Sequence, residues 1–455
     1  MSPKKKEPEV PVKKEEKKRR RAKQYQTVRG MRDILPQDQP FWQKLRKTVE
    51  RIANDYSFQR IDTPIVEFRE LFERGTGKGT DIVEKEMYKF KTRGGDDVTL
   101  RPEGTPSVVR AYIEHGMQSY PKPVKLFYIG PMYRYDRPQE GRYRELFQFG
   151  FEAIGEQDPI MDAQLIQMAV RIYQALGLKK VSVQLNSIGC KECRPNYNKL
   201  LVNYFNNRKK ALCMDCKKRL KINPLRILDC KEDKCVQVVS QAPQTIDHLC
   251  DNCKQHFTFL LECLDEIEIP YELNPRLVRG LDYYTKTVFE IWPKNTEEGN
   301  QSALGGGGRY DYLVELLGGM PTPAVGFAGG IDRIVGEMSK LNVEAYYPPL
   351  PRVYLAQLGD LAKKKSLKIF EEIERSGIVV AESFGRGSLK SQLRQANHLN
   401  VEIVLIIGQR EALDETVILK DMRSGSQEIV TFEKVVKEVK KRLKDENGGV
   451  VVKGK

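Results

Sequence analysis

The sequence predicts an α+β protein whose antiparallel-sheet domain is divided by a cysteine-rich helical insertion and followed by a small α/β domain. Between residues 125 and 155, two runs rich in Tyr, Phe and Ile flank a polar loop, which is typical of an antiparallel hairpin. Eight of the nine cysteines fall within residues 190–253, in a Lys/Arg-rich, helix-like stretch. From residue 352 onwards, strand-like and helix-like segments alternate, which indicates an α/β domain.

The length and composition limit the kind of protein. A chain of 455 residues exceeds the size at which one hydrophobic core usually divides, so several domains are expected. We expect no membrane span, because no apolar run approaches the ~18 residues that a bilayer requires. The first two dozen residues are charged and lack the apolar stretch of a secretory signal. We therefore expect a cytoplasmic protein whose cysteines are thiols or metal ligands.

The net charge of +15 favours a polyanionic partner, but the charge is unevenly placed. Residues 1–23 contain 11 Lys/Arg and 4 Glu, so almost half of the excess lies in a segment too polar to fold. This tail either attracts RNA phosphates nonspecifically or is a solvated, dispensable extension. The sequence favours neither alternative.

Before the insertion, the elements are predicted from the spacing of apolar residues and from residues that begin or end helices. Apolar residues at helical spacing predict an amphipathic helix over residues 39–56, and a strand-like stretch covers residues 58–66. After the hairpin, Asp158 and Pro159 begin a helix that Gly177 ends. Helices and antiparallel strands are therefore mixed in this region of the chain.

After the insertion, strands and tight turns resume over residues 273–292 and 302–311, and a helix covers residues 330–341. A proline-rich linker near residue 350 precedes the α/β domain, which ends in a basic amphipathic helix. The other elements predicted there are strand 352–358, helix 360–375, strand 378–382, helix 388–398, strand 401–407 and a hairpin at 423–427.

Several motifs of well-known sites are incomplete. GTGKGT at residues 75–80 lacks the GxxxxGK[ST] spacing of a phosphate-binding loop. GGGGRYD at residues 305–311 lacks the acidic partner about 20 residues further on that a dinucleotide fingerprint needs. The four histidines, at positions 115, 248, 256 and 398, have no catalytic candidate near them, so no histidine-based nucleophile relay is expected.

Arginines and carboxylates set among aromatic residues are the remaining candidates for chemistry. A guanidinium is always charged, and its fork matches two phosphate oxygens. Four arginines together could therefore neutralise a triphosphate, although each alone is better explained as a salt-bridge partner: Arg134, Arg142, Arg279 and Arg333. Glu103 and Glu152 could hold a substrate ammonium. Gln148, Tyr284 and Tyr310 could add hydrogen bonds, with core packing as the alternative for the tyrosines.

Three segments resemble the signature motifs of class II aminoacyl-tRNA synthetases. The predicted hairpin, with Arg134 on its first strand and FQFGFE at residues 147–152 on its second, resembles motif 2. GFAGGIDR at residues 326–333 resembles motif 3. RIDTPIVE at residues 60–67 resembles motif 1, which lies at the dimer interface in that family, so a homodimer is implied.

Two further segments narrow the resemblance to one amino acid. LVRGLDYYTKTVFE at residues 277–290 and ALGGGGRYD at residues 303–311 are similar to the histidine-specific motifs of histidyl-tRNA synthetases. The matches together run from about residue 28 to residue 443. The resemblance implies a histidine–tRNA ligase that activates L-histidine with ATP and Mg²⁺ and transfers it to the 3′ end of tRNA(His).

The resemblance also implies roles for individual residues. Six are implied to contact histidine: Glu103, Gln148, Glu152, Tyr283, Tyr284 and Tyr310. Arg134 is implied to bind the ATP α-phosphate, and Arg142 and Arg333 the outer phosphates. Arg279 is implied to stabilise charge on the α-phosphate during adenylate formation, which makes Arg279 and Arg134 the implied catalytic residues. No base for the transfer step is implied.

The expected organisation combines the resemblance with the changes in composition. The C-terminal domain is implied to bind the anticodon, with residues 385–397 as its most basic surface, and the insertion to contact the tRNA acceptor arm. The predicted organisation is a disordered tail 1–24, a catalytic domain formed by residues 25–188 and 270–346, an insertion domain 189–269, an anticodon-binding domain 352–443 and a disordered tail 444–455. Motifs 1 and 2 lie in the first catalytic segment, and motif 3 and the histidine-specific motifs lie in the second.

The clustered cysteines predict structural zinc. They form three CxxC pairs and one C-x₄-C pair: Cys190/Cys193, Cys213/Cys216, Cys230/Cys235 and Cys250/Cys253. Such pairs suit one or two tetrahedral thiolate sites, and the spacing leaves the grouping of ligands open. Free thiols are the first alternative and disulfides the second. We expect His256 to be a surface histidine rather than a ligand, and Cys263 to lie in the core.

Two other functions compete with the ligase. One is a non-catalytic, histidine-sensing regulatory subunit of ATP phosphoribosyltransferase, which would resemble the catalytic domain alone, whereas this chain keeps a C-terminal domain and Arg279. The other is a zinc-ribbon RNA-binding protein, which would leave the arginines unexplained. Histidine-stimulated exchange between ATP and pyrophosphate would separate the ligase from both.

Overall fold

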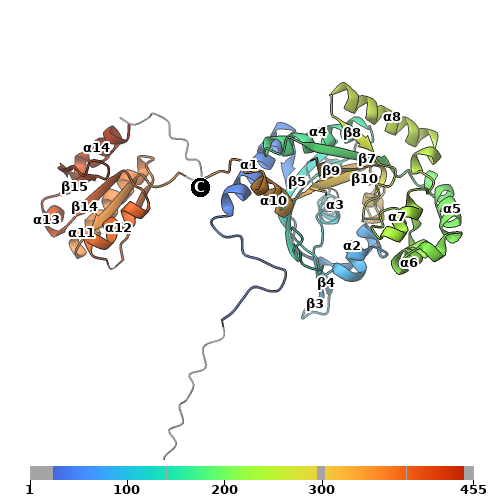
Figure 1. Cartoon of the computed structure of the whole chain (residues 1–455), viewed down its shortest axis with the longest axis horizontal. Coiled ribbons are helices and arrows are strands. Elements are labelled where there is room, and N and C mark those ends of the chain that lie inside the picture. The colour runs from blue at the N-terminus through green and yellow to red at the C-terminus, as the bar shows by residue number, and fades with distance from the viewer. Residues whose placement is uncertain (1–23, 140, 295–302, 348, 386, 445–455) are drawn as a thin grey trace, which may run out of the picture. The chain divides into compact units, whose positions relative to one another are not determined.

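The structure is a computed structural model that describes residues 24–139, 141–294, 303–347, 349–385 and 387–444. The chain divides into two compact units, Met1–Tyr346 and Tyr347–Lys455 (Figure 1). The two tails expected to be disordered fall outside the described residues, apart from residues 24 and 444. No helix among the described residues is long and apolar enough to cross a membrane.

An eight-stranded sheet forms the centre of the first unit. Its strands, in spatial order, are β1 (Gln59–Arg60), β5 (Val124–Tyr133), β6 (Glu145–Ile154), β11 (Ala324–Gly330), β10 (Gly305–Arg309), β9 (Thr285–Pro293), β7 (Val181–Ser187) and β8 (Tyr271–Leu273). The outer pairs β1–β5 and β7–β8 are parallel, and the pairs between them are antiparallel. The predicted hairpin is confirmed as β5 and β6, and the predicted α+β class is confirmed with it.

The two faces of this sheet have different compositions because side chains alternate along each strand. One face carries packed aromatic rings, including Phe151 and Phe327 stacked at 5.4 Å between centroids. Helices α1 (Gln39–Asp55), α4 (Ile160–Ala175) and α10 (Ile331–Lys340) contribute buried apolar side chains to the same core. The opposite face contributes to a second apolar cluster, but its central strands also carry Glu152 and Glu290 opposite glycines, so it is the face on which a polar ligand can be bound.

Further elements of the first unit lie in the connections from β1 to β5 and from β10 to β11. They are β2 (Val66–Phe68), α2 (Arg69–Phe72), π-helical turns Glu73–Gly77 and Ile82–Glu86, β3 (Lys89–Lys91), β4 (Asp97–Leu100), α3 (Thr105–Glu114), a 3₁₀ turn Met117–Ser119 and α9 (Leu313–Leu316). The single strand predicted over residues 58–66 is wrong, because only β1 and the start of β2 are strand. Pro64 lies between them and has no N–H for a ladder, and the Arg101 guanidinium takes the Thr63 carbonyl at 2.7 Å.

The insertion is helical, as predicted. It contains α5 (Cys193–Asn206), a 3₁₀ turn Lys209–Ala211, α6 (Met214–Ile222), a 3₁₀ turn Pro224–Ile227, α7 (Asp233–Val239), a 3₁₀ turn Thr245–His248 and α8 (Asp251–Glu266). Figure 1 shows these helices gathered on one side of the large sheet. The expectation of a surface histidine at position 256 is wrong: His256 is buried, with Nε2 at 3.4 Å from both Asp162 Oδ1 and Thr287 Oγ1.

The second unit is an α/β domain built on a five-stranded sheet. Its strands, in spatial order, are β13 (Val380–Glu382), β12 (Val353–Gln357), β14 (Ile403–Ile407), β15 (Thr416–Asp421) and β16 (Gln427–Thr431), with helices α11 (Asp360–Arg375), α12 (Leu389–His398), α13 (Gln409–Leu413) and α14 (Phe432–Lys444). Pairs involving β12 are parallel, and β14–β15–β16 is antiparallel. The short helix α13 was not predicted.

Candidate active site

Two buried carboxylates lie side by side on the polar side of the sheet. Glu103 precedes α3 and is 4% exposed, and Glu152 on β6 is 1% exposed. Among the residues that the structure describes, both accept hydrogen bonds from hydroxyls only: Glu103 from Thr76 and from Tyr283 at 2.8 Å, and Glu152 from Thr105 at 2.7 Å and from Tyr310. A buried carboxylate that lacks a bonded cation is costly, so this pocket is suited to a ligand that brings positive charge.

The protonation of these carboxyls follows from their burial. Burial raises the pKa of Glu152 to about 8, and the neighbouring Glu103 adds to the increase, although the Tyr310 and Thr105 hydroxyls oppose it. Burial also raises the pKa of Glu103 against the hydrogen bonds from Thr76 and Tyr283. Two carboxyls so close together resist double ionisation until a cation arrives.

Three of the predicted tyrosines form one wall of this pocket. Tyr283, Tyr284 and Tyr310 are 6%, 5% and 1% exposed. The ring of Tyr283 lies 4.6 Å from that of Tyr284 and 5.7 Å from that of Tyr310, measured between centroids. Because the hydroxyls of Tyr283 and Tyr310 bond the two carboxylates, these tyrosines do more than pack the core, which was their alternative role.

Glycines on the central strands let the backbone form the floor of the site. The register pairs Gly326 with Glu152 and Gly306 with Glu290. A Cβ on Gly326 would lie 1.9 Å from the Glu152 Oε2, and one on Gly306 would lie 2.7 Å from the Arg279 Nη1. The GGGG segment is therefore strand β10, and a flexible turn there is excluded. Gln148, half-buried on β6, pairs with Gly330 at the end of the same floor.

Arg279 and Arg134 both act electrostatically on Glu103 in the carboxylate pocket. The Nη1 of Arg279 donates to Glu290, and its Cζ lies 6.0 Å from the centroid of the Tyr284 ring. Its side chain is 19% exposed. The Nε of Arg279 is buried and has no hydrogen-bond partner within the described portion of the chain. An unused donor on a fixed cation is suited to an incoming anion.

The other three predicted arginines gather at the tip of the hairpin and the start of α10. Arg134 donates to the Pro102 carbonyl at 2.8 Å, and Arg142 pairs with Asp136. Arg333 donates to the carbonyls of Gly141 at 3.3 Å and Ala303 at 3.0 Å. Burial lowers the pKa of Arg333, and repulsion from Arg142 and Arg134 lowers it further. A cation repelled by two neighbouring cations is suited to a multiply charged anion.

Several residues of the site were not predicted from the sequence. Thr76 lies in the GTGKGT segment, which lacks the spacing of a phosphate loop, yet its hydroxyl serves Glu103. Thr105 follows the RPEG sequence and serves Glu152. Glu290 ends the LVRGLDYYTKTVFE segment and pairs with Arg279, which lies 11 residues earlier, before β9 begins. Their presence in one segment is the only sequence signal of this pairing.

Arg309, in the GGGGRYD segment, belongs to a structural ion pair. It is fully buried, with its Nη2 at 2.7 Å from Asp162 Oδ2 and its Nη1 at 3.2 Å from Asp311 Oδ1. Burial opposes the charge on Asp162, but Arg309 and His256 more than offset it and hold the Asp162 pKa below its usual value. This pair attaches β10 to α4 and leaves Tyr310 facing Glu152.

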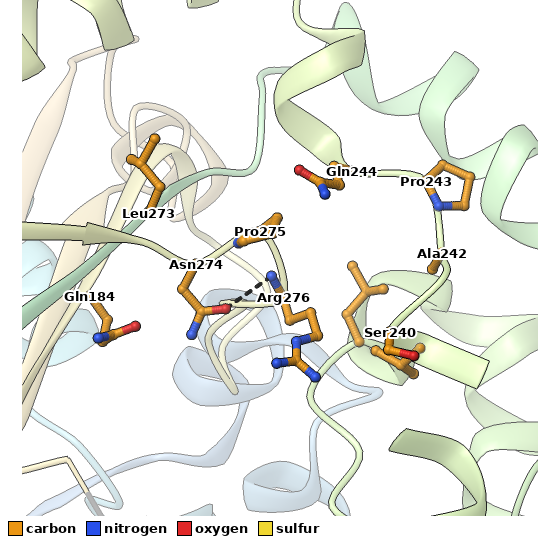
Figure 2. A pocket seen from close by; sticks show the side chains of 11 residues that line it. Gln184, Ser240, Ala242, Pro243, Gln244, Leu273, Asn274, Pro275 and Arg276 are labelled. Carbon is orange, nitrogen blue, oxygen red and sulfur yellow. Dashed lines mark hydrogen bonds between the residues drawn. The ribbon is translucent and has the colours of Figure 1, made fainter. Parts of the chain in front are cut away.

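A separate pocket of about 420 Å³ lies between strands β7 and β8 and the insertion (Figure 2). Gln184 and Leu273 line it from the sheet, and Pro243 and Gln244 from the insertion. In Figure 2 the backbone N–H of Arg276 donates to the Asn274 side chain at 3.1 Å. None of the candidate residues above lines this pocket, so it is distinct from the candidate active site.

The fold and the site together define a class of protein. An antiparallel sheet with polar ligand-binding residues on one face, arginines on its hairpin and after its last strand, and a separate α/β domain are the features of a class II aminoacyl-tRNA synthetase. The family model described as Histidyl-tRNA synthetase matches residues 30–192 and 218–334, and the one described as Anticodon binding domain matches residues 352–442.

Individual proteins agree over nearly the full length. The histidine–tRNA ligase of Dehalococcoides mccartyi is 49% identical over 419 residues, which cover 92% of this chain and 100% of that protein. The histidine–tRNA ligase of Syntrophotalea carbinolica is 45% identical over 406 residues, 89% of this chain and 96% of that one. The solved structure of apo S. aureus histidyl-tRNA synthetase matches with a TM-score of 0.75 at 34% identity and covers 91% of this chain and 99% of its own. The chain belongs to the histidyl-tRNA synthetase family.

Proposed function

We propose that this protein is a histidine–tRNA ligase, which joins histidine to ATP as an adenylate and then passes it to tRNA(His). The observation that carries the proposal is the position of two buried carboxyls, Glu103 and Glu152, in the same site as four arginines: Arg279, Arg134 and Arg142 of the hairpin, and Arg333 of α10. Such a site binds a cationic amino acid on one side and a polyphosphate on the other. The protein is expected to act in the cytoplasm.

The pocket binds the cationic groups of histidine. Glu103 and Glu152 neutralise the substrate's positive charge. The substrate's side chain is enclosed by three tyrosines, and their burial supports this role: Tyr283, Tyr284 and Tyr310. Gln148, on the same strand β6 as Glu152, offers a further hydrogen bond to the substrate. A site that hydrogen-bonds an imidazole rejects apolar analogues by ~10⁴-fold or more, because its buried polar groups would be left unpaired.

The arginines bind the triphosphate and stabilise the charge that develops in activation. The histidine carboxylate attacks the α-phosphorus, pyrophosphate leaves, and negative charge builds on the nonbridging oxygens. Arg134 and Arg279 face the α-phosphate, and Arg142 and Arg333 hold the outer phosphates. The Nε of Arg279, which has no hydrogen-bond partner among the described residues, supports this role because it is a donor that needs no rearrangement.

Mg²⁺ is proposed to accompany ATP. Mg²⁺ is usually bound by phosphate oxygens with one or two carboxylates. Burial raises the pKa of Glu86, while Arg134 and Arg142 lower it, so this carboxyl lies within electrostatic reach of the proposed phosphate site. Glu86 is therefore the carboxylate that we propose as a ligand of this Mg²⁺ ion. The ion would supply further positive charge to the phosphates.

The second unit is proposed to recognise the anticodon. The basic surface predicted over residues 385–397 falls largely on α12, where Lys390 and Arg394 are exposed. Arg386 lies outside the described residues. We expect the double variant Lys390→Glu/Arg394→Glu to raise the KM for tRNA while leaving ATP–pyrophosphate exchange unchanged. An unchanged KM for tRNA would remove this surface from the proposal.

A homodimer is proposed through the segment that resembles motif 1. Ile65 and Val66 in that segment are 40% and 43% exposed, and Phe68 and Phe90 on the adjoining three-stranded sheet are 64% and 44% exposed. Apolar side chains grouped on the two outer strands of this sheet, β2 and β3, which both pair with β4, mark an interaction surface. A Phe68→Glu variant is expected to sediment as a monomer, and a dimer of unchanged strength would contradict the interface.

The test of the function is ATP–pyrophosphate exchange with each of the twenty amino acids. Exchange is expected with histidine alone. Arg279→Ala is expected to lower the rate by about 10²–10³-fold, the usual loss for one preorganised donor. Arg276→Ala, which removes an exposed arginine three residues upstream, is the control and should change the rate little. Histidine binding without exchange would instead identify the non-catalytic regulatory alternative.

A further inference from the structure

The eight clustered cysteines form two groups of four. We propose that each group binds one Zn²⁺ ion and that the two ions hold the insertion against the histidine pocket, which is the pocket of Glu103 and Glu152. The neck cluster is Cys190, Cys193, Cys250 and Cys253, and the loop cluster is Cys213, Cys216, Cys230 and Cys235. Within each group all four sulfurs lie within 4.8 Å of one another. The structure thus supplies the grouping that the spacing left open.

The spacing of the sulfurs fits a metal tetrahedron. Four sulfurs at ~2.3 Å from a tetrahedral Zn²⁺ are separated from one another by about 3.8 Å. The Sγ of Cys190 lies 3.7 Å from that of Cys193 and 3.8 Å from that of Cys250. In the loop cluster, the sulfurs of Cys213 and Cys230 are 3.9 Å apart. A disulfide would require ~2.05 Å, so these pairs are arranged as co-ligands.

The surroundings of the sulfurs favour thiolates. In the neck cluster the backbone N–H of Cys250 donates to the Cys193 sulfur at 3.1 Å, and in the loop cluster that of Cys213 donates to the Cys235 sulfur at 3.2 Å. Cys193 begins α5, while Cys213 and Cys250 are the N-caps of α6 and α8. Amide donors and helix N-termini both stabilise negative sulfur, as they do around metal-bound cysteines.

Four thiolates select the ion and its role. Soft sulfur ligands in a tetrahedral arrangement suit Zn²⁺ or iron. We choose Zn²⁺ because histidine activation transfers no electrons. Each group supplies four thiolates, which fill a tetrahedral ion and leave no coordination position open for a substrate, so both sites are structural. Elemental analysis and thiol titration, described below, distinguish zinc from iron, free thiols and disulfides.

The neck cluster connects the two ends of the insertion to the histidine pocket. Cys190 and Cys193 lie where the chain leaves the sheet, and Cys250 and Cys253 lie at the start of the helix that returns to it. Arg194, next to the ligand Cys193, donates to the backbone carbonyl of Tyr284. An ion bound to this cluster therefore fixes a side chain that contacts the pocket wall.

The loop cluster reaches the same pocket from the other side. The helix α6, which carries Cys216, and the turn after it supply Arg219 and Arg226, whose guanidiniums pair with Asp81 at 2.9 Å and 3.0 Å. Asn223, between them, donates to the Asp282 side chain at 2.8 Å. The backbone N–H of Asp282 in turn donates to the Thr76 carbonyl at 3.0 Å.

This path ends at a histidine-binding carboxylate, because the hydroxyl of Thr76 donates to Glu103. The chain of contacts from the loop cluster thus runs through Asn223, Asp282 and Thr76 to Glu103. Loss of the ion would release α6 and its turn, and the Glu103 carboxylate would lose its fixed position. This consequence rests on the proposed function, whereas the metal binding itself does not.

The metal sites are tested by elemental analysis of the full-length protein purified without chelators. Two zinc ions per chain are expected, falling to one in Cys193→Ser and one in Cys216→Ser. Cys263→Ser, which removes the cysteine outside both clusters, should keep two. Fewer than two metal equivalents in the unaltered protein, or iron in place of zinc, would overturn the assignment.

A second measurement covers the case in which the cysteine variants do not fold. The unaltered protein is exchanged into Co²⁺, whose visible spectrum distinguishes tetrahedral sulfur ligation. Two equivalents with that spectrum are expected. Thiol titration in denaturant with chelator should find all nine cysteines reduced. A lower thiol count would indicate disulfides and overturn the proposal.

The link to the pocket is tested by Asn223→Ala, which leaves both cysteine clusters intact. With two zinc ions retained, the KM for histidine in ATP–pyrophosphate exchange is expected to rise about tenfold, within the range of coupling between sites, while the KM for ATP stays unchanged. Asn207→Ala, at an exposed position of the insertion, is the control.

The two failures are distinguishable in the same preparation. An unchanged KM for histidine in Asn223→Ala would overturn the link between insertion and pocket. Absence of exchange by the unaltered protein carrying two zinc ions would overturn the ligase and leave the metal sites standing.

Discussion

The chain buries carboxylates in two contrasting ways. Asp162 on α4 is fully buried against the guanidinium of Arg309, and its pKa is held below the usual value. Glu152 on β6 is 1% exposed and, within the described part of the chain, accepts hydrogen bonds from hydroxyls only, so burial raises its pKa to about 8. The same chemical group thus has opposite titration behaviour in two places of one domain. A buried charge with its counter-ion in place belongs to the fold, whereas one without it is prepared for a charged ligand.

The largest effect should come from breaking the paired site. Asp162→Asn leaves the Arg309 guanidinium buried without its main counter-charge, and we expect the free energy of unfolding to fall by about 3–5 kcal/mol. Urea unfolding measures this. Asp55→Asn, which removes an exposed partner of Arg51, should cost below about 1 kcal/mol and is the control. A loss no larger than the control would show that Arg309 does not depend on Asp162.

The same carboxylate-to-amide change at the unpaired site should act in the opposite direction. Glu152→Gln keeps the side chain's shape and removes the cost of burying a carboxyl whose pKa is raised to about 8. Since one pKa unit corresponds to about 1.4 kcal/mol, we expect a gain in the free energy of unfolding of about 1–3 kcal/mol at pH 8. The KM for histidine should rise by about 10–100-fold, because a charged contact is lost. A loss of stability similar to that of Asp162→Asn would remove the contrast.

The pH dependence sharpens the comparison further. The raised pKa means that Glu152 is protonated in the free protein below about pH 8, and cation binding requires its proton to leave. The KM for histidine should therefore fall as pH rises from 6 to 8, by up to about tenfold per unit, and the profile should flatten in Glu152→Gln.

Stability should change with pH in the other direction. Between the ordinary glutamate pKa of 4.5 and about 8, the unfolded chain loses the Glu152 proton first, so this group makes stability fall as pH rises. Asp162 acts oppositely: its lowered pKa gives stability that is present above about pH 3.8 and is lost as pH falls through the folded value. Unfolding curves of Glu152→Gln that keep the full decline above pH 4.5 would contradict the assignment.

The smallest effect concerns the hydroxyl that positions Glu103. Thr76→Val removes one donor to this carboxylate, and the KM for histidine should rise by roughly 3–10-fold. Thr80→Val is the matched control, because the Thr80 hydroxyl lies in the same segment and donates at 2.8 Å to a backbone carbonyl. Equal effects of the two substitutions would show that the segment, and not the hydroxyl, supports Glu103.

The local elements and the motif residues could be predicted because they depend on neighbours in sequence. The hairpin of β5 and β6 follows from two runs rich in Tyr, Phe and Ile around a polar loop, and helices α11, α12 and α14 of the second unit follow from the alternation of strand-like and helix-like segments. The arginines at positions 134, 142, 279 and 333 were identified by their position among aromatic residues. The divided strand over residues 58–66 was missed, because its pairing is decided by Arg101, 38 residues away from Thr63.

Buried polar contacts were the least predictable feature of the protein. His256 was assigned to the surface because nothing near it in sequence shows that α8 packs it against Asp162, 94 residues earlier. Thr76 carried no signal of its own, since its segment resembles an unrelated motif and its partner Glu103 comes from another loop. Such contacts depend on where whole elements pack, which spacing along one element does not record.

The sequence by itself determined the fold class, the motifs of the family and the number of clustered cysteines. Only the tertiary structure decided which four sulfurs lie together, and that Asp162 pairs with a guanidinium whereas Glu152 accepts hydrogen bonds from hydroxyls. The physical reason is that the energy of a buried charge depends on the groups that surround it in space. Asp162 and Glu152 are both acids flanked by apolar residues in the sequence. Their pKa values differ because the fold brings Arg309 and His256 to Asp162, whereas Tyr310, which follows β10, donates a hydroxyl to Glu152.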